Sequence, residues 1–256
     1  MTTPKIKTIH KNDSRLYVWD GGEYPGVTSV VGMLPKPALQ YWAAKKVAEA
    51  AIERGKVTER DINWLKAAPK RDLNQAAEKG SSVHDTLDRL VNGETVDIPD
   101  DERGFIDGFH QFCDRYEPDF IMTEETVHGA VGDYGYCGSF DALIDIAGET
   151  WLIDFKTTRS GVHPEVAIQL AAYANAMSII HPDGSSESVP KIDRFGVLWL
   201  RPEEWAFVEL NVTQDQYDPA FKTFGALLAA WHWENRLKKK AIGVRQASGR
   251  SSAAPF

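Results

Sequence analysis

The spacing of apolar residues divides the chain into a first part with a helical period and a second part with the alternation of strands. Around Asp20-Gly21-Gly22 apolar and polar residues alternate, which predicts a strand from Leu16, a turn, and a short strand that leads into a helix near Val31. Apolar residues then recur every three to four positions, and this spacing predicts helices over 38–54, 58–67, 71–91 and 100–116.

From residue 118 onward the pattern changes to that of strands. Three successive strands are predicted over 120–128, 136–146 and 149–157, with Ala147-Gly148 as a tight turn between the last two. The remaining pattern predicts a helix over 164–180, a loop over 181–191, strands over 194–200 and 205–212, and a helix over 213–240. This order indicates an α/β fold in which helices flank one central mixed sheet.

The chain contains no internal repeat and no linker-like segment, so we expect a single domain over 1–245. Within it we expect an N-terminal hairpin and helical extension over 1–70, a core over 71–212 and a C-terminal helix over 213–245. The Ser-, Ala- and Gly-rich residues 246–256 are predicted to form a flexible tail.

The composition is that of a globular protein, since 43% of its 256 residues are hydrophobic, and this excludes a wholly disordered chain. With 29 Lys and Arg against 37 Asp and Glu, the formal charge of −8 argues against holding nucleic acid by bulk charge alone. Two cysteines are too few for a disulfide framework. The polar N-terminus and the absence of an apolar run of about 20 residues predict a cytoplasmic protein without a membrane segment.

Two charged residues interrupt the apolar strand over 149–157. Because side chains alternate between the two faces of a strand, Asp154 and Lys156 share one face, and Trp151, Ile153 and Phe155 share the other. An acid and an amine on a mostly apolar strand need a partner or a ligand, because lone buried charges are costly. The pair therefore indicates either a functional site or a salt bridge between strands at the end of a sheet.

The preceding strand carries Asp141 on the face opposite to its apolar residues. Pairing across the Ala147-Gly148 turn would bring Asp141 beside Asp154, and two close carboxylates repel each other unless a cation lies between them. Oxygen ligands of this kind suit Mg²⁺ or Mn²⁺. Asp145 lies nearer the turn and is expected to be a solvated turn residue.

Three further positions could contribute to the same site. Glu124 and Glu125 face opposite sides of their strand, so one of them reaches the site, and alternation alone does not choose between them. Gly80 and His84 lie one helical turn apart, where glycine would let the helix approach the sheet. His84 is then either a metal ligand or a histidine of the core.

A polar line runs along the predicted helix over 164–180. Glu165, Gln169 and Tyr173 follow one another at intervals of four residues on a helix of otherwise Ala, Leu and Ile residues. This line is either a hydrogen-bonded stripe over the core or the side of a helix that faces the same cavity as the acids.

In this order the motifs resemble the RecB-type branch of the PD-(D/E)XK nucleases. The resemblance covers 71–173 and rests on Gly80-Ser-Ser-Val-His84, Glu124, Asp141, Asp154-Phe155-Lys156 and Gln169-Leu-Ala-Ala-Tyr173. The segment Pro25–Val31, followed by Trp42, is also similar to phage exonucleases and the mitochondrial genome maintenance exonuclease of this branch. Phe140 departs from the pattern, since it stands where the named proline would be.

The resemblance implies a restriction-endonuclease-like core and one or two Mg²⁺ or Mn²⁺ ions. By analogy the metal ligands are His84, Asp141, Asp154 and the Phe155 carbonyl, with help from Glu124. The family's spacing favours Glu124 over Glu125. Lys156 would orient or activate water, while Gly80, Gln169 and Tyr173 support the site and approach DNA. No iron–sulfur cluster is implied, because the cysteines that bind one in CRISPR-associated relatives are missing here.

Basic and aromatic residues gather in the N-terminal helical region. Trp42 with Lys45 and Lys46 would suit a platform that stacks bases and holds phosphates, although Trp42 also lies on the apolar stripe and suits a core position. The cations near the C-terminus are as well explained by a solvated helix end. If the N-terminal segment covers the helix over 80–84, a DNA strand would have to thread beneath it.

These observations favour a metal-dependent DNA exonuclease that acts from a free single- or double-stranded end, as in phage-type DNA recombination or processing. Its setting would be the cytoplasm of a bacterium or a phage-infected host, with a single-strand annealing protein as a potential partner. Three alternatives stay open: an endonuclease at the same site, a catalytically silent nucleic-acid-binding module, and an enzyme whose acids serve in general acid–base catalysis.

Overall fold

The computed structural model describes residues 6–11, 14–241 and 243, so the tail over 246–256 lies outside the described residues. The first part contains, in chain order, β1 (Thr8–Lys11), β2 (Ser14–Trp19), β3 (Gly22–Pro25), α1 (Val27–Val31), α2 (Ala38–Arg54), a 3-10 turn (Glu59–Asp61), α3 (Ile62–Lys66), α4 (Ala68–Val91) and α5 (Arg103–Tyr116). The second part contains β4 (Asp119–Thr123), β5 (Thr126–Val131), β6 (Tyr134–Ser139), β7 (Ala142–Ile146), β8 (Glu149–Lys156), α6 (Glu165–Ala174), β9 (Ser178–Ile180), β10 (Ser186–Glu187), β11 (Arg194–Leu200), β12 (Trp205–Glu209) and α7 (Pro219–His232).

The central sheet is mixed, as expected, and has the strand order β12-β11-β8-β7-β4. Strands β8 and β11 run parallel, while the other neighbours in this sheet run antiparallel. The turn at Ala147-Gly148 joins β7 to β8, and both of its residues have the positive φ angles of a tight hairpin turn. The fold is therefore α/β.

The expectation of a single sheet was wrong, because two predicted strands each divide between two sheets. The segment 120–128 becomes β4 and β5, and the segment 136–146 becomes β6 and β7. Strands β4 and β7 pair in the central sheet, whereas β5 and β6 pair in a four-stranded sheet of order β10-β9-β5-β6. The two-stranded ribbon bends at Glu124, whose φ of 55° interrupts the extended backbone.

Helices cover both faces of the central sheet. Helices α4 and α5 pack on one face, where Leu87 and Phe109 share a hydrophobic cluster with Ile153 of β8. On the other face α6 packs through Leu170 against Leu152 of β8. Because neighbouring residues of β8 enter different clusters, the strand is buried on both sides.

The segments on either side of residues 71–212 also build the core. The second cluster includes Leu16 and Val27 from the N-terminal part and Phe224 from α7, together with Tyr136 of β6. The expected boundary at residue 71 falls inside α4. The N-terminal hairpin is joined to the main body further by a parallel bridge between Gly26 and Cys137.

Two helices differ in length from their predictions. The helix over 164–180 ends at Ala174, where Asn175 donates its side-chain Nδ2 to the Ala171 carbonyl, and residues 178–180 form β9. The last helix begins at Pro219 rather than Thr213, because Asp218 accepts the backbone N–H of Ala220 as an N-cap. It continues as a π turn (Trp233–Leu237) and a 3-10 turn (Lys238–Lys240).

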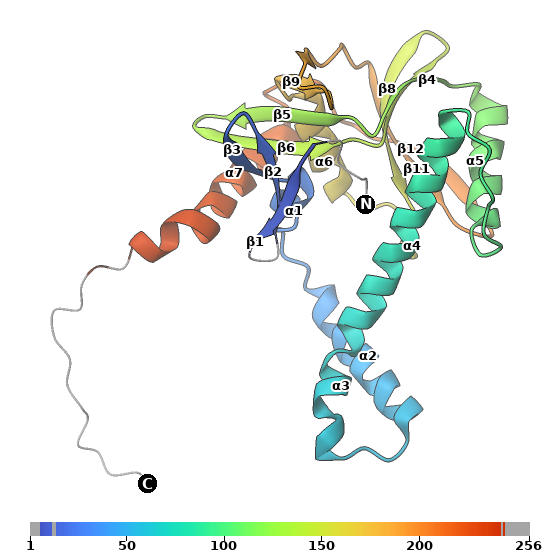
Figure 1. Ribbon diagram of the computed structural model, residues 1–256, viewed down its shortest axis with the longest axis vertical. Helices are drawn as coiled ribbons and strands as arrows, with labels where there is room; N and C mark the ends of the chain where they lie inside the picture. Colours follow the sequence, from blue (N-terminus) through green and yellow to red (C-terminus); the bar gives the residue numbers. More distant parts are fainter. Residues whose placement is uncertain (1–5, 12–13, 242, 244–256) are drawn as a thin grey trace.

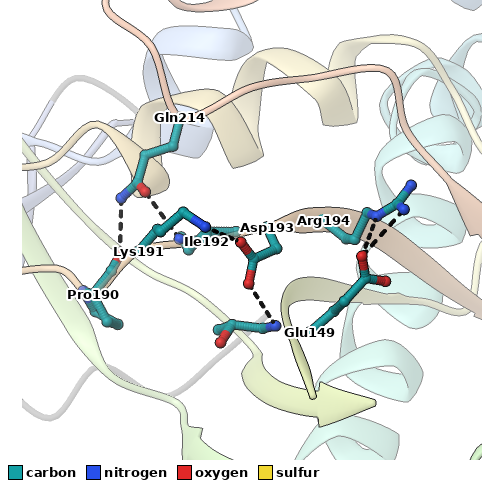
Figure 2. Close-up of polar contacts among 8 residues, drawn as sticks. Glu149, Pro190, Lys191, Ile192, Asp193, Arg194 and Gln214 are labelled. Atoms are coloured by element: carbon teal, nitrogen blue, oxygen red, sulfur yellow. Dashed lines mark hydrogen bonds and ion pairs between the residues drawn. The ribbon is translucent and has the colours of Figure 1, made fainter. Parts of the chain in front are cut away.

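A network of polar contacts fixes the start of β11 beside β8 (Figure 2). Gln214 donates Nε2 to the Pro190 carbonyl at 2.9 Å and accepts the backbone N–H of Ile192 at 2.9 Å. Arg194 pairs with Glu149 at the start of β8. These contacts hold the register of the two parallel strands, and β8 carries the charged pair that the sequence singled out.

Helices α2 and α3 and the first half of α4 project from this body (Figure 1). In this projection α2 packs beside α4, where Lys46 Nζ lies 2.8 Å from Asp72 Oδ1. A Cβ placed on Gly80 would meet Thr157 alone within 4 Å. Helix α2 packs along the N-terminal half of α4, near Asp72, and so it does not cover the stretch 80–84 as the sequence led us to expect (Figure 1).

Candidate functional site

The site is built at the bend of the β4–β7 ribbon. The Glu124 N–H donates to the Asp141 carbonyl at 3.0 Å, and the Phe140 N–H donates to the Glu125 carbonyl at 3.0 Å. These bonds continue the ribbon through the bend and keep Glu124 beside Asp141. Both acidic side chains are buried.

Asp141 lies beside the end of β8, as the sequence predicted. Ala142 pairs with Ile153 in the antiparallel register, so the next residues, Asp141 and Asp154, are neighbours. The Phe155 N–H donates to Asp141 Oδ2 at 2.6 Å. Both Asp141 and Asp154 are almost fully buried, with exposed fractions of 5% and 1%.

His84 reaches the acids from α4. The helix passes close to the end of β8, where a Cβ on Gly80 would lie 3.2 Å from Thr157 Oγ1. The buried His84 ring packs edge-on against Phe155, and its Nδ1 lies 3.6 Å from Asp141 Oδ1 without a hydrogen-bond partner. His84 therefore belongs to the site and also touches the core.

Of the two neighbouring glutamates, Glu124 is the one that reaches the site. One ligand atom each from His84, Glu124 and Asp141 lies within 4.8 Å of the other two. Glu125 points elsewhere, with Oε2 3.7 Å from His181 Nδ1. The left-handed backbone at Glu124 produces this outcome, which strand alternation alone does not specify.

The side chain of Asp154 is held by a cation and an amide. Lys156 Nζ lies 2.6 Å from Asp154 Oδ2, and Gln169 Nε2 donates to Asp154 Oδ1 at 2.8 Å. Gln169 Nε2 also lies 3.3 Å from the Tyr173 hydroxyl, to which it donates. The polar line on α6 thus faces the site, and the strand pair Asp154–Lys156 is an ion pair within one strand.

Burial and the neighbouring charges set the protonation of the two aspartates. Burial raises the pKa of Asp154 to about 6, against the opposing effect of Lys156, and repulsion from Asp141 acts in the same direction as burial. Burial also acts to raise the pKa of Asp141, but His84, Lys156 and the Phe155 N–H outweigh it and hold that pKa below its usual range. The Asp141 carboxyl thus stays ionised, while the Asp154 carboxyl titrates near pH 6.

Lys156 keeps its positive charge in this setting. Burial acts to lower the pKa of the Lys156 ammonium, but Asp154 and Asp141 outweigh burial and raise it. Even when His84 is protonated, the three carboxylates Glu124, Asp141 and Asp154 outnumber the two cations His84 and Lys156 if all are ionised. Such an imbalance in a buried site favours a bound cation.

The donor set of His84, Glu124 and Asp141 could hold a metal ion. It offers one imidazole nitrogen and carboxylate oxygens, a combination that suits Mn²⁺ and, through the oxygens, Mg²⁺. Within the described part of the chain the imidazole Nδ1 has no hydrogen-bond partner, as expected of a ligand atom without its ion. Asp154 is not a member of this compact group; its Oδ2 lies 2.6 Å from Lys156 Nζ, and its Oδ1 accepts from Gln169 Nε2.

The predicted N-terminal contacts lie outside the site. Trp42 is half-buried on α2 and belongs to neither hydrophobic cluster. Lys46 pairs with Asp72 and Glu49, and Lys45 lies 3.7 Å from Glu49. Lys46 therefore connects α2 to α4 through an ion pair. The sequence pattern did not predict this structural role.

Two supporting contacts were missed by the sequence analysis. Thr123 donates its hydroxyl to Asp88 Oδ1 at 2.6 Å, which ties the residue before Glu124 to the helix of His84. Arg201 donates to the Thr157 carbonyl at 2.6 Å and holds the end of β8. The spacing of Asp88, four residues after His84, is a signal that could have suggested the first contact.

Comparison with known proteins leaves the family open. No protein-family model matches the chain. A search of curated proteins likewise finds no match. Among solved structures, the crystal structure of SSO0001 is 15% identical with a TM-score of 0.37, over 81% of this chain and 96% of that chain. A likeness at this level assigns no function.

Proposed function

We propose that the chain is a metal-dependent phosphodiesterase that cleaves DNA. The observation that supports this most is the convergence of His84, Glu124 and Asp141 within 4.8 Å beside the Asp154–Lys156 pair. A general acid–base site would not require this grouping of acids around an imidazole nitrogen. The order of these residues along the chain also resembles that of RecB-type nucleases.

In this proposal His84, Glu124 and Asp141 would hold Mg²⁺ or Mn²⁺, and Asp154 lies beside Asp141. A bound divalent ion lowers the pKa of a coordinated water and offsets the charge of a phosphate. Lys156 places its ammonium where it stabilises negative charge that develops on the phosphate. Gln169, with Tyr173 behind it, keeps the Asp154 carboxyl oriented.

The exonuclease form of the activity rests on the family resemblance. A strand threaded under an N-terminal cover does not support it, because α2 packs along the N-terminal half of α4 (Figure 1). The same resemblance suggests a role in phage-type recombination, with a single-strand annealing protein as a partner. No described helix has the length and apolar character that crossing a bilayer requires.

The test is digestion of end-labelled linear DNA and covalently closed circles, single- and double-stranded, with Mg²⁺, Mn²⁺ or EDTA. We expect degradation of linear DNA with either metal and none in EDTA. Equal rates on linear and circular DNA would replace the exonuclease by an endonuclease. Binding without cleavage under all metal conditions would contradict the enzyme and favour a silent binding module.

A further inference from the structure

Residues 38–79 form the projection that is here named the helical arm, and few of their side chains are buried. It comprises α2, α3 and the first half of α4, and it extends away from the sheets (Figure 1). Within it only Ala50, Asp61 and Ala68 are buried. The arm is held by helix-to-helix contacts such as the Lys46–Asp72 ion pair, rather than by a core of its own.

Exposed apolar side chains concentrate on this arm. Of eleven large apolar side chains exposed in the described part of the chain, seven lie on it: Leu39, Tyr41, Ile52, Val57, Ile62, Trp64 and Leu73. Tyr41 and Ile52 are each 81% exposed, and with Lys45 and Ala48 they follow one another at helical spacing along α2. A gathering of this kind marks an interaction surface.

The charge of the arm is opposite to that of the chain. The arm has nine Lys and Arg against six Asp and Glu, a net charge of +3, within a chain of −8. No ion pair among the described residues involves the cations Lys56, Arg60, Lys66 or Lys70. These charges favour an anionic partner surface.

A matching acidic surface lies on the same molecule. Residues 94–119, here named the acidic segment, include α5 and contain nine Asp and Glu against two Arg, a net charge of −7. Glu102 is buried and, with Asp101, pairs with Lys79 of the same chain.

Five acids of the segment are exposed and belong to no ion pair among the described residues: Asp97, Asp107, Asp114, Glu117 and Asp119. Asp107 and Asp114 are exposed and lie two helical turns apart on one side of α5. Ile121, 47% exposed on β4, supplies an apolar side chain next to this segment.

We propose that the helical arm of one copy of this chain docks on the acidic segment of a second copy. The tip of the arm and α5 lie in different parts of the molecule (Figure 1), so the contact joins two unlike surfaces. Five of the seven exposed apolar side chains of the arm are aliphatic. Aliphatic side chains favour a protein surface over nucleic-acid bases, which stack on aromatic rings. The contact is independent of metal and substrate.

The experiment measures molar mass by sedimentation across protein concentrations, without metal or DNA. We expect a wild-type mass that rises with concentration and falls with added salt, because the contact is partly electrostatic. The arm variant Tyr41→Ser/Ile52→Ser and the acidic variant Asp107→Lys/Asp114→Lys should each weaken association at least about tenfold. Met177→Ser is the matched control, since Met177 is exposed outside both surfaces.

Mixing the two variants tests that the contact joins unlike surfaces. The arm variant keeps an intact acidic segment and the acidic variant keeps an intact arm, so the mixture should form a dimer and nothing larger. A wild-type protein that stays monomeric over its whole soluble range would overturn the proposal. An arm variant with unchanged mass but weakened oligonucleotide binding would also overturn it and assign the arm to nucleic acid.

Discussion

At the scale of single residues, neighbouring side chains of the same type have different roles because the backbone changes direction between them. Glu124 has a left-handed backbone and faces His84 and Asp141, whereas Glu125 faces His181. The two glutamates are therefore a matched pair, in which one substitution tests the site and the other serves as its control.

Under the proposed function we predict that Glu124→Gln reduces metal-dependent cleavage about 100-fold or more, because Glu124 would then be a charged metal ligand. Glu125→Gln should retain cleavage within a factor of a few. Steady-state rates with Mn²⁺ and circular dichroism of both variants are the measurements. Equal losses in the two variants would remove Glu124 from the site.

His84 can be tested as a ligand separately from its packing against Phe155. We predict that His84→Ala weakens Mn²⁺ binding, measured by calorimetry, about tenfold or more. His84→Phe keeps a ring in the core without a ligand nitrogen and should show the same loss. Mn²⁺ affinity that is unchanged in His84→Phe would make His84 a core residue only.

Asp154 predicts a particular pH dependence of stability. Its folded-state pKa of about 6 exceeds its ordinary value, so the ionised carboxyl destabilises the metal-free fold above pH 6. This cost fades as the pH falls through 6 towards the unfolded value, because the folded state then takes up the proton first. From the size of the shift, the cost at neutral pH is on the order of 3 kcal/mol.

Asp154→Asn should therefore be more stable relative to wild type at pH 8 than at pH 5. The measurement is the free energy of urea unfolding in EDTA at both values. The Asp145→Asn variant, altered at the solvated turn, controls for general effects of removing a carboxylate. A difference between Asp154→Asn and wild type that does not change with pH would contradict the assigned cause.

At the scale of elements, the close approach of α4 to β8 depends on glycine. A Cβ at Gly80 would lie 3.2 Å from Thr157 Oγ1, so alanine there would require the Thr157 side chain or the helix to shift slightly. Alanine also has the better helix propensity, by about 1 kcal/mol. The steric contact lowers the stability of Gly80→Ala, and the helix propensity of alanine raises it. The gain from helix propensity can be measured when Thr157 is replaced by alanine, because the contact is then removed.

We predict that Gly80→Ala increases the free energy of unfolding by about 1 kcal/mol in the Thr157→Ala background and by less in wild type. Denaturant unfolding of the four proteins of this cycle is the measurement. Cleavage should fall in Gly80→Ala alone and recover in the double variant. If the changes in unfolding free energy of the two single variants add up to that of the double variant, Gly80 and Thr157 are not in contact.

At the scale of the whole molecule, stability is distributed unevenly. The body has two hydrophobic clusters on either side of the central sheet, whereas the helical arm buries only three residues. Regions with few buried apolar contacts open locally at a lower free energy than the core. We therefore expect the arm to open at a lower free energy than the body.

We predict that amide hydrogen exchange of α2 and α3 in the monomer is much faster than exchange of β8 and β11. Exchange measured by mass spectrometry at low protein concentration checks this. Protection of α2 should rise with protein concentration if the arm docks on a second copy. Protection of α2 equal to that of β8 in the monomer would contradict the uneven distribution.

The sequence by itself determined most of the helices and the pairing of the strands on either side of one turn, but not the division of two predicted strands or the strand β9. The period-two alternation and the tight Ala147-Gly148 turn were enough to predict that Asp141 lies beside Asp154, because a hairpin turn sets the register. Helical spacing likewise predicted that Gly80 lets α4 approach the sheet. These are local rules, and they hold wherever one hairpin or one helix decides the outcome.

Only the tertiary structure decided which sheet each strand joins and which partners the side chains find. Alternation specifies the two faces of a strand but not the bend at Glu124, which depends on β5 pairing with β9 and β6. The Gln169–Asp154 hydrogen bond and the placement of α2 along α4 likewise join segments distant in the chain. Contacts of this kind follow from packing, which local patterns do not encode.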